Sequence, residues 1–202
     1  MKHLSYFLLS STFLAAPISA ATLNFNEATD GDLGSPIAPT TVTFDVGVNS
    51  LIGQVNLTAG DTRDAIAFSI LPGQALQSVF LRSYDDPSTK GENDGNVGFF
   101  QFDEGTVSVI PDENNSGSLL TGRTFDFDAV DGLNLLNSGL NQTDGPGIAS
   151  GQLGPGNFVF SIQNTSPDIT STFAIDFVVV PEPSVPMLAG LGGLLCLARR
   201  RR

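Results

Sequence analysis

The 202-residue chain carries 21 acidic against nine basic residues, a net charge of −12, and it contains one His, one Cys and no Trp. Nucleic acid is excluded as a partner, because binding phosphates requires a basic surface. His3 and Cys196 lie at opposite ends of the chain, so the domain between them lacks the residues for Ser-His-Asp or Cys-His catalysis and for His- or Cys-bound zinc. We therefore expect a protein that is not an enzyme.

Residues 1–21 have the three parts of a secretory signal peptide. A charged start is followed by an apolar run over residues 4–16 and then by small residues. The apolar run is too short for a stable membrane anchor, and Pro17 ends it. We expect export by the secretion machinery, with the leader cleaved after Ala20 or Ala21.

Residues 22–180 are expected to form one domain, in which 20 acidic and four basic residues give a net charge of −16. Short apolar segments with period-two alternation are separated by turns rich in Gly, Asn, Asp and Pro, which predicts about eight half-buried strands. Leu71-Pro72-Gly73-Gln74 is typical of a type II turn between two of them. An all-β sandwich of two packed sheets follows from such strands. The expected strands are 41–46, 51–57, 65–70, 75–83, 97–102, 106–110, 157–162 and 172–179.

Two acidic segments of the domain offer oxygen ligands for Ca²⁺, a hard cation that binds six to eight oxygens. The second of them is similar to the start of a calcium loop, but it has an extra residue before its third Asp and no Glu at the required distance. A solvated loop and a solvated strand face are the simpler interpretation of both, so calcium is an open alternative and no other cofactor is expected. The candidate ligands are Asp85, Asp86, Glu92 and Asp94 in the first segment and Asp126, Asp128 and Asp131 in the second.

The C-terminal residues 181–202 divide into three parts. Pro181-Glu182-Pro183 follows a Val-rich strand, and the prolines are expected to end that strand and to begin a stiff, accessible linker. The uncharged segment 185–198 would form a helix roughly 21 Å long, short of the ~30 Å hydrocarbon core. It is Gly-rich and apolar all round, which favours a short transmembrane helix over a helix of a soluble domain.

The chain ends with Arg199, Arg200, Arg201 and Arg202. Long arginine side chains reach the membrane interface and extend the effective span of a short helix. A cluster of arginines after an apolar segment stays in the cytoplasm, so the domain before it lies outside. The signal peptide predicts the same orientation independently.

The order Pro-Glu-Pro, short apolar segment and terminal Arg cluster resembles the PEP-CTERM sorting signal of Gram-negative bacteria, a segment also called the ice-binding protein C-terminal domain. The resemblance implies that the tail holds the exported protein transiently in the inner membrane until an exosortase cuts near the motif. It also implies a final location at the cell surface or outside the cell, often together with exopolysaccharide or biofilm production. Pro181, Glu182 and Pro183 would be recognised rather than catalytic.

A second resemblance lies in the strands. Residues 64–76, 153–165 and 26–33 are similar to segments of the bacterial pre-peptidase C-terminal type domain, with residues 173–180 as its closing strand, although Ile66 stands where that family tends to carry Tyr. The resemblance implies a jelly-roll-like β-sandwich used as an accessory or adhesion module. Two functions stay open at this point: a structural or adhesive matrix component, and a binding module for polysaccharide or Ca²⁺.

Overall fold

The computed structural model describes residues 22–56, 63–85, 98–108, 119–125, 132–138, 148, 151–164 and 170–182. The predicted signal peptide, the apolar segment at 185–198 and the Arg cluster at 199–202 lie outside these residues. Within the described part of the chain, no helix is both long enough and apolar enough to cross a bilayer. The fold is therefore that of the domain between the two ends.

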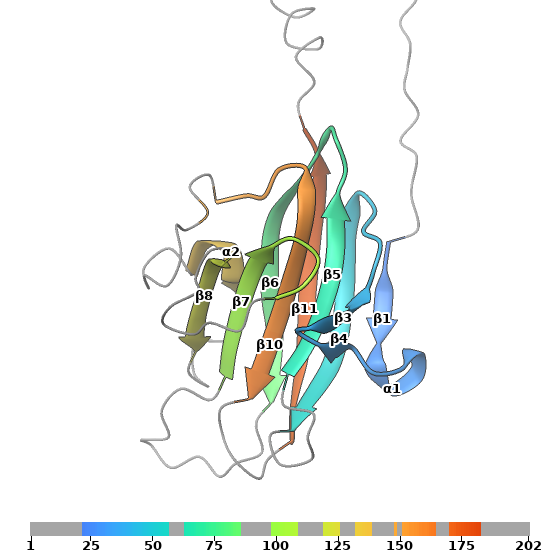
Figure 1. Ribbon diagram of the computed structural model, residues 1–202, viewed down its shortest axis with the longest axis vertical. Coiled ribbons are helices and arrows are strands. Elements are labelled where there is room, and N and C mark those ends of the chain that lie inside the picture. The colour runs from blue at the N-terminus through green and yellow to red at the C-terminus, as the bar shows by residue number, and fades with distance from the viewer. Residues whose placement is uncertain are drawn as a thin grey trace, which may run out of the picture.

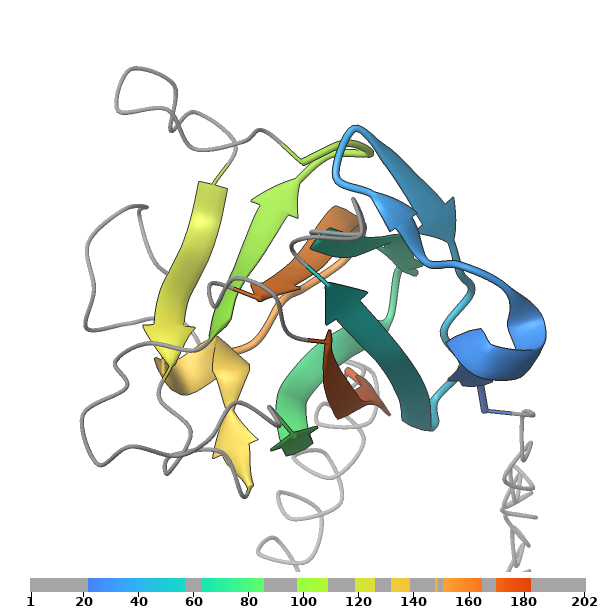
Figure 2. The same ribbon diagram turned by 90° about the horizontal axis from the view of Figure 1, so that it is seen from below.

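Two β-sheets form this domain, one of five strands in the order β1-β4-β11-β6-β9 and one of six in the order β2-β3-β5-β10-β7-β8 (Figure 1). Seen from below, the sheets lie as two layers (Figure 2). This confirms the all-β class with little helix. The elements are β1 (Asn24–Asn26), α1 (Glu27–Asp30), β2 (Gly34–Ser35), β3 (Ala38–Thr41), β4 (Gly47–Asn56), β5 (Arg63–Ile70), β6 (Gln74–Asp85), β7 (Gly98–Glu104), β8 (Leu119–Phe125), β9 (Leu133–Asn134), α2 (Leu135–Ser138), β10 (Gly156–Asn164) and β11 (Thr170–Pro181).

The central strands form where apolar residues alternate along the sequence. β10 lies antiparallel between β5 and β7, with Phe160 opposite both Ile66 and Phe102. In the other sheet, β11 lies antiparallel between β4 and β6. Alternation sends every second side chain of these strands into the space between the sheets. The predicted strands at 65–70, 75–83, 157–162 and 172–179 are confirmed.

A group of phenylalanines fills the space between the sheets. The Phe177 ring of β11 lies 4.8 Å from that of Phe44, 5.4 Å from Phe160 and 5.9 Å from Phe68, measured between centroids. Phe160 and Phe68 belong to the six-stranded sheet, whereas Phe177 belongs to the five-stranded one. The completely buried Phe177 therefore contacts both layers.

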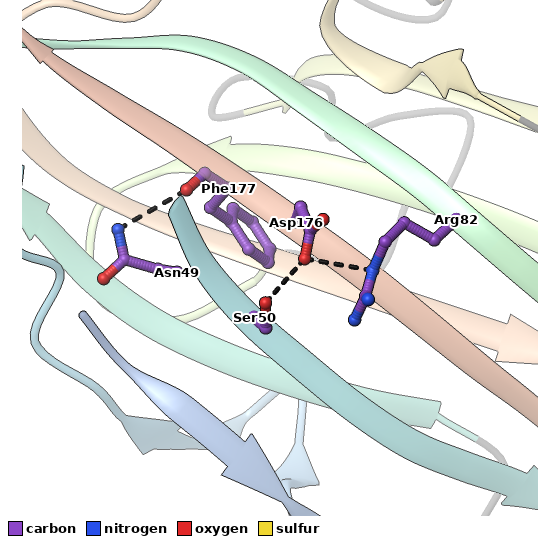
Figure 3. A network of polar contacts seen from close by, with 5 residues as sticks. All are labelled: Asn49, Ser50, Arg82, Asp176 and Phe177. Carbon is purple, nitrogen blue, oxygen red and sulfur yellow. Dashed lines mark hydrogen bonds and ion pairs between the residues drawn. The ribbon is translucent and has the colours of Figure 1, made fainter. Parts of the chain in front are cut away.

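Polar contacts join the strands of the five-stranded sheet (Figure 3). The Asp176 carboxylate accepts a hydrogen bond from Ser50 Oγ at 2.7 Å and lies 3.0 Å from Arg82 Nε, so it links β4, β11 and β6. Because the Arg82 side chain is 45% exposed, this ion pair contributes only about 0–1 kcal/mol. Asn49, on the other face of β4, is completely buried and donates to the Phe177 carbonyl at 3.4 Å.

Two predicted strands are wrong in the described residues. In the segment 41–46 only Thr41 lies in a strand, because the chain crosses there from β3 in one sheet to β4 in the other. Val42 and Phe44 are nevertheless buried, and Val42 N–H still donates to the Ala67 carbonyl of β5 at 2.9 Å, so the alternation seen in the sequence reflects burial over the core just past the end of β3. In the segment 106–110, residues 106–108 form no strand; Ser108 N–H donates instead to the Pro36 carbonyl at 2.9 Å.

The sequence interpretation missed strand β8, which pairs antiparallel with β7. Gly122 interrupts the apolar pattern of β8. Because glycine is unfavourable inside a strand, the sequence does not predict one there. The structure gives the reason for the glycine: a Cβ there would lie 3.0 Å from the Phe100 carbonyl oxygen and 3.1 Å from Phe99 Cζ. Gly122, which makes β8 difficult to predict from the sequence, is thus the residue that allows β7 and β8 to approach each other.

Candidate functional site

Most of the predicted calcium ligands fall outside the described residues. Asp85 is the last residue of β6, and it is exposed. Asp86, Glu92, Asp94, Asp126, Asp128 and Asp131 lie outside the described residues, as do Pro183 and the four terminal arginines. Whether the two predicted acidic segments bind calcium therefore stays a prediction.

The first two residues of the Pro-Glu-Pro motif are part of the folded domain. Pro181 is the last residue of β11 and lies opposite Gln74 of β6. Glu182 N–H donates to the Gly73 carbonyl at 2.8 Å. The strand therefore ends at Pro181, as expected, but Pro181 is itself part of the strand, and the linker does not begin before Glu182 has formed one more backbone hydrogen bond to the domain. Proline is tolerated at the end of a strand, where its missing N–H interrupts no continuing ladder.

The turn that holds the motif has the predicted type II features. Gln74 N–H donates to the Leu71 carbonyl at 3.0 Å, and Gly73 has a φ of +82°. A type II turn requires a positive φ at its third residue and favours proline at its second, which here is Pro72. The Pro-Gly pair therefore places the Gly73 carbonyl where Glu182 can reach it.

A second candidate site brings together three carboxylates from distant parts of the sequence. Glu27, Asp32 and Asp64 each offer an oxygen, and these oxygens lie within 4.8 Å of one another. Glu27 is the first residue of α1, Asp32 follows that helix, and Asp64 is the second residue of β5. Asp64 is 1% exposed, whereas Asp32 is exposed. The cluster thus extends from the buried Asp64 to the exposed Asp32 at the surface.

Local structure fixes the position of Glu27. Asn26 caps the one-turn helix α1 by accepting a hydrogen bond from Ala28 N–H at 3.1 Å, and Asp30 accepts one from Asn26 N–H at 2.8 Å. The Glu27 carboxylate accepts a hydrogen bond from Gln54 N–H of β4 at 2.7 Å. A Cβ on Gly53 would lie 2.5 Å from Phe173 Cζ, 2.9 Å from Leu33 Cδ1 and 3.0 Å from Glu27 Oε2, so the absent side chain leaves room for two apolar side chains and for this carboxylate.

The three carboxylates create a strongly negative point. Two unit charges 4.8 Å apart repel by about 3 kcal/mol at an effective dielectric constant of about 20. The neighbouring Arg63 points to the other face of β5, because successive side chains of a strand alternate. Burial, which penalises the charged form, lowers the pKa of Arg63. A hard cation would offset the repulsion, and two oxygens at about 2.4 Å from one Ca²⁺ are at most about 4.8 Å apart.

Sequence reasoning missed this cluster as a metal site. It considered runs of acids close together in the chain, whereas these three acids come from residues 27 to 64 and meet only in the fold. The segment 26–33 was part of a family resemblance, but no metal ligand was predicted in it. Gly53, a glycine inside strand β4, is the one local signal that another group approaches the backbone there.

A β-sandwich whose last strand continues into Pro-Glu-Pro, an apolar segment and an Arg cluster defines a class of exported protein with a C-terminal sorting signal. Comparison with known families shows this signal directly: residues 179–202 match the PEP-CTERM protein-sorting motif. The match confirms the predicted sorting signal, and it supports exosortase-dependent sorting of an exported protein.

Among solved structures, the domain is similar to the pre-peptidase C-terminal domain of a collagenase from Bacillus anthracis. The two share 9% sequence identity with a TM-score of 0.34 over 69% of this chain and 92% of the other. No curated protein matches the chain.

Proposed function

We propose that this chain is a non-enzymatic surface or extracellular-matrix protein, which an exosortase cuts from its membrane anchor and which acts together with exopolysaccharide in a biofilm. The observation that carries the proposal is the sorting motif at residues 179–202, which begins within the last three residues of the last strand of the sandwich. A mature domain without His or Cys supports a structural role rather than catalysis. Its net charge of −16 keeps it soluble after release.

The proposed processing predicts two forms of the protein. In cells with the exosortase, the domain is expected in a shortened form at the surface or in the medium; in a strain deleted for the exosortase gene, the full chain is expected to accumulate in the membrane fraction. Immunoblotting against the domain after fractionation measures both. Equal amounts of the shortened form in the two strains would contradict the proposal.

A second candidate function is calcium binding at Glu27, Asp32 and Asp64, as part of a module that binds polysaccharide or Ca²⁺. Its support is the convergence of three carboxylates from separate segments, one of them 1% exposed. The concentration of free Ca²⁺ outside cells would then set the stability of the domain.

Calcium is expected to raise the melting temperature of the protein. A ligand at 100 times its Kd stabilises the native state by about 2.7 kcal/mol, which corresponds to about 5–10 °C for a domain of this size. Thermal unfolding in EDTA, in Ca²⁺ and in Mg²⁺ measures the shift. The Asp64→Asn variant is expected to lose it, whereas Asp85→Asn should keep it. Loss in Asp85→Asn alone would place the ion in the first predicted acidic segment, and no shift in the wild type would overturn the proposal.

A polysaccharide partner is tested separately by retention of the protein on the exopolysaccharide of the producing strain. Retention that disappears in EDTA would favour the binding module, because calcium would then be needed for contact with the glycan. Retention that is unaffected by EDTA would favour the structural matrix component. Absence of retention in both conditions would leave the matrix role without a polysaccharide partner and contradict that part of the proposal.

A further inference from the structure

The folded domain holds the beginning of its own sorting motif. Pro181 lies in register with Gln74, and Glu182 N–H donates to the Gly73 carbonyl at 2.8 Å. Both motif residues are exposed, so side chains of the motif face solvent while its backbone is bound to the β5–β6 turn. Figure 1 shows the end of β11 beside this turn, at the upper end of the sandwich.

The start of β6, directly after the β5–β6 turn, is held by a second backbone contact. Leu76, two residues into β6 after Gln74, exchanges backbone hydrogen bonds with Leu153 at 2.8 and 3.0 Å. The Glu182 carboxylate lies beside Gly154, since a Cβ on that glycine would be 3.9 Å from Glu182 Oε1. Glu182 is thus bonded through its backbone to the β5–β6 turn, and its exposed side chain passes near Gly154.

We propose that the β5–β6 turn is an internal binding site for the sorting motif, and that the exosortase cuts only those copies in which this end of β11 has opened. The inference rests on the proposed function, because it assumes that the exosortase reads the motif. An enzyme that grips a substrate as an extended chain uses the same backbone groups that pair strands in a sheet. The Glu182 N–H and the pairing of Pro181 with Gln74 are therefore unavailable until the strand end opens.

The length of the tail leaves the enzyme little room to avoid this contact. Only Pro183 and Ser184 separate Glu182 from the apolar segment that begins at Val185. Three residue steps place the Cα of Val185 at most about 11 Å from that of Glu182. A membrane enzyme that contacts Glu182 must therefore approach within reach of the folded domain. Local opening at a strand end is far more frequent than global unfolding, so it can set the cleavage rate while the domain stays folded.

A reversible covalent lock tests the proposal in the full chain. Ala75 and Val180 are register partners one step before the motif, and antiparallel partners have the separation that a disulfide requires. In a Cys196→Ser background, which leaves no other Cys, the Ala75→Cys/Val180→Cys protein is expected to be cut at least tenfold more slowly in pulse–chase experiments in exosortase-containing cells. Reduction with dithiothreitol is expected to restore the rate, and the two single-Cys variants serve as controls.

A second pair of variants opens the contact rather than closing it. Gly73→Ala places a side chain at a φ of +82° in the turn that holds Glu182, and Gly132→Ala places one at a φ of +80° in a turn at β9. Neither added Cβ has a neighbour within 4 Å, so the backbone strain is matched. We expect cleavage of Gly73→Ala to be several-fold faster than that of the wild type, with Gly132→Ala unchanged.

The outcomes separate this inference from the function on which it rests. Wild-type protein that is cut equally with and without the exosortase would contradict the proposed function. Exosortase-dependent cleavage of the wild type, together with a locked variant cut at the rate of its single-Cys controls, would overturn the internal binding site alone. Equal acceleration by Gly73→Ala and Gly132→Ala would overturn it as well, because general destabilisation would then explain the effect.

Discussion

Replacing Phe177 with alanine is expected to lower the free energy of unfolding by about 3–5 kcal/mol. The side chain is completely buried, and its ring lies within 5.9 Å of three other phenylalanine rings, centroid to centroid. The substitution removes apolar area and aromatic contacts, each aromatic pair contributing about 0.5–1.5 kcal/mol beyond its area. It also leaves a cavity between the two sheets. Because domains are stable by only about 5–15 kcal/mol, this is a large fraction of the total.

The matched control is Phe80→Ala, in the neighbouring strand β6. Phe80 is the same residue type but 37% exposed, so we expect a loss of about 1 kcal/mol or less. The chain has no Trp, so urea unfolding is best followed by far-UV circular dichroism. Equal losses in the two variants would show that Phe177 does not occupy the space between the sheets.

Replacing Asn49 with alanine is expected to cost about 2–4 kcal/mol, because the side chain satisfies several backbone groups in the interior. Its Oδ1 accepts from Leu23 N–H at 3.0 Å and from Asp45 N–H at 3.1 Å. Its Nδ2 donates to the carbonyls of Asp45 at 2.8 Å, of Gly47 at 3.4 Å and of Phe177 at 3.4 Å. The variant leaves these groups without their side-chain partner, and it removes one contact between the start of the domain and β4, whose pairing with β1 remains.

Ser50→Ala provides the control at the next position of the same strand. Its hydroxyl makes one hydrogen bond, to Asp176 on the partly buried face of the sheet, so a loss of about 1 kcal/mol is expected (Figure 3). Urea unfolding compares the two variants under one set of conditions. A cost for Asn49→Ala no greater than that for Ser50→Ala would contradict the role assigned to the buried amide.

The strands that the sequence predicts best are those with one apolar face and one partner on each side. β11 is an example, since Phe173, Ile175 and Phe177 share a buried face; β10 has Phe158, Phe160 and Ile162 on such a face, although Val159 on its other face is buried too. The predicted strands are wrong where a buried residue lies outside a strand, or where a strand residue has no apolar side chain. Val42 and Phe44 are buried although they belong to no strand, and Gly122 belongs to a strand although it has no apolar side chain.

The two candidate sites differ in the same way. The sorting signal could be found from the sequence because its three parts follow one another within residues 181–202. The acidic cluster could not, because Asp64 joins Glu27 and Asp32 only after β5 has packed beside the N-terminal segment. Which backbone groups hold Glu182 also depends on the fold, because Gly73 is more than 100 residues away in the chain.

The sorting motif and the acidic cluster lie at opposite ends of the sandwich. β5 contains Asp64 as its second residue and ends before the turn that binds Glu182, and its eight residues span about 25 Å. Figure 1 shows α1 at the lower end and the end of β11 at the upper end.

The mass of the released protein tests the central claim most directly. The domain is purified from the medium or the cell surface of the producing strain, and its C-terminal peptide is identified by mass spectrometry. Removal by the exosortase predicts a chain that ends near Pro181–Pro183 and lacks both the apolar segment and Arg199–Arg202. A released protein that still ends at Arg202 would contradict processing at the sorting motif.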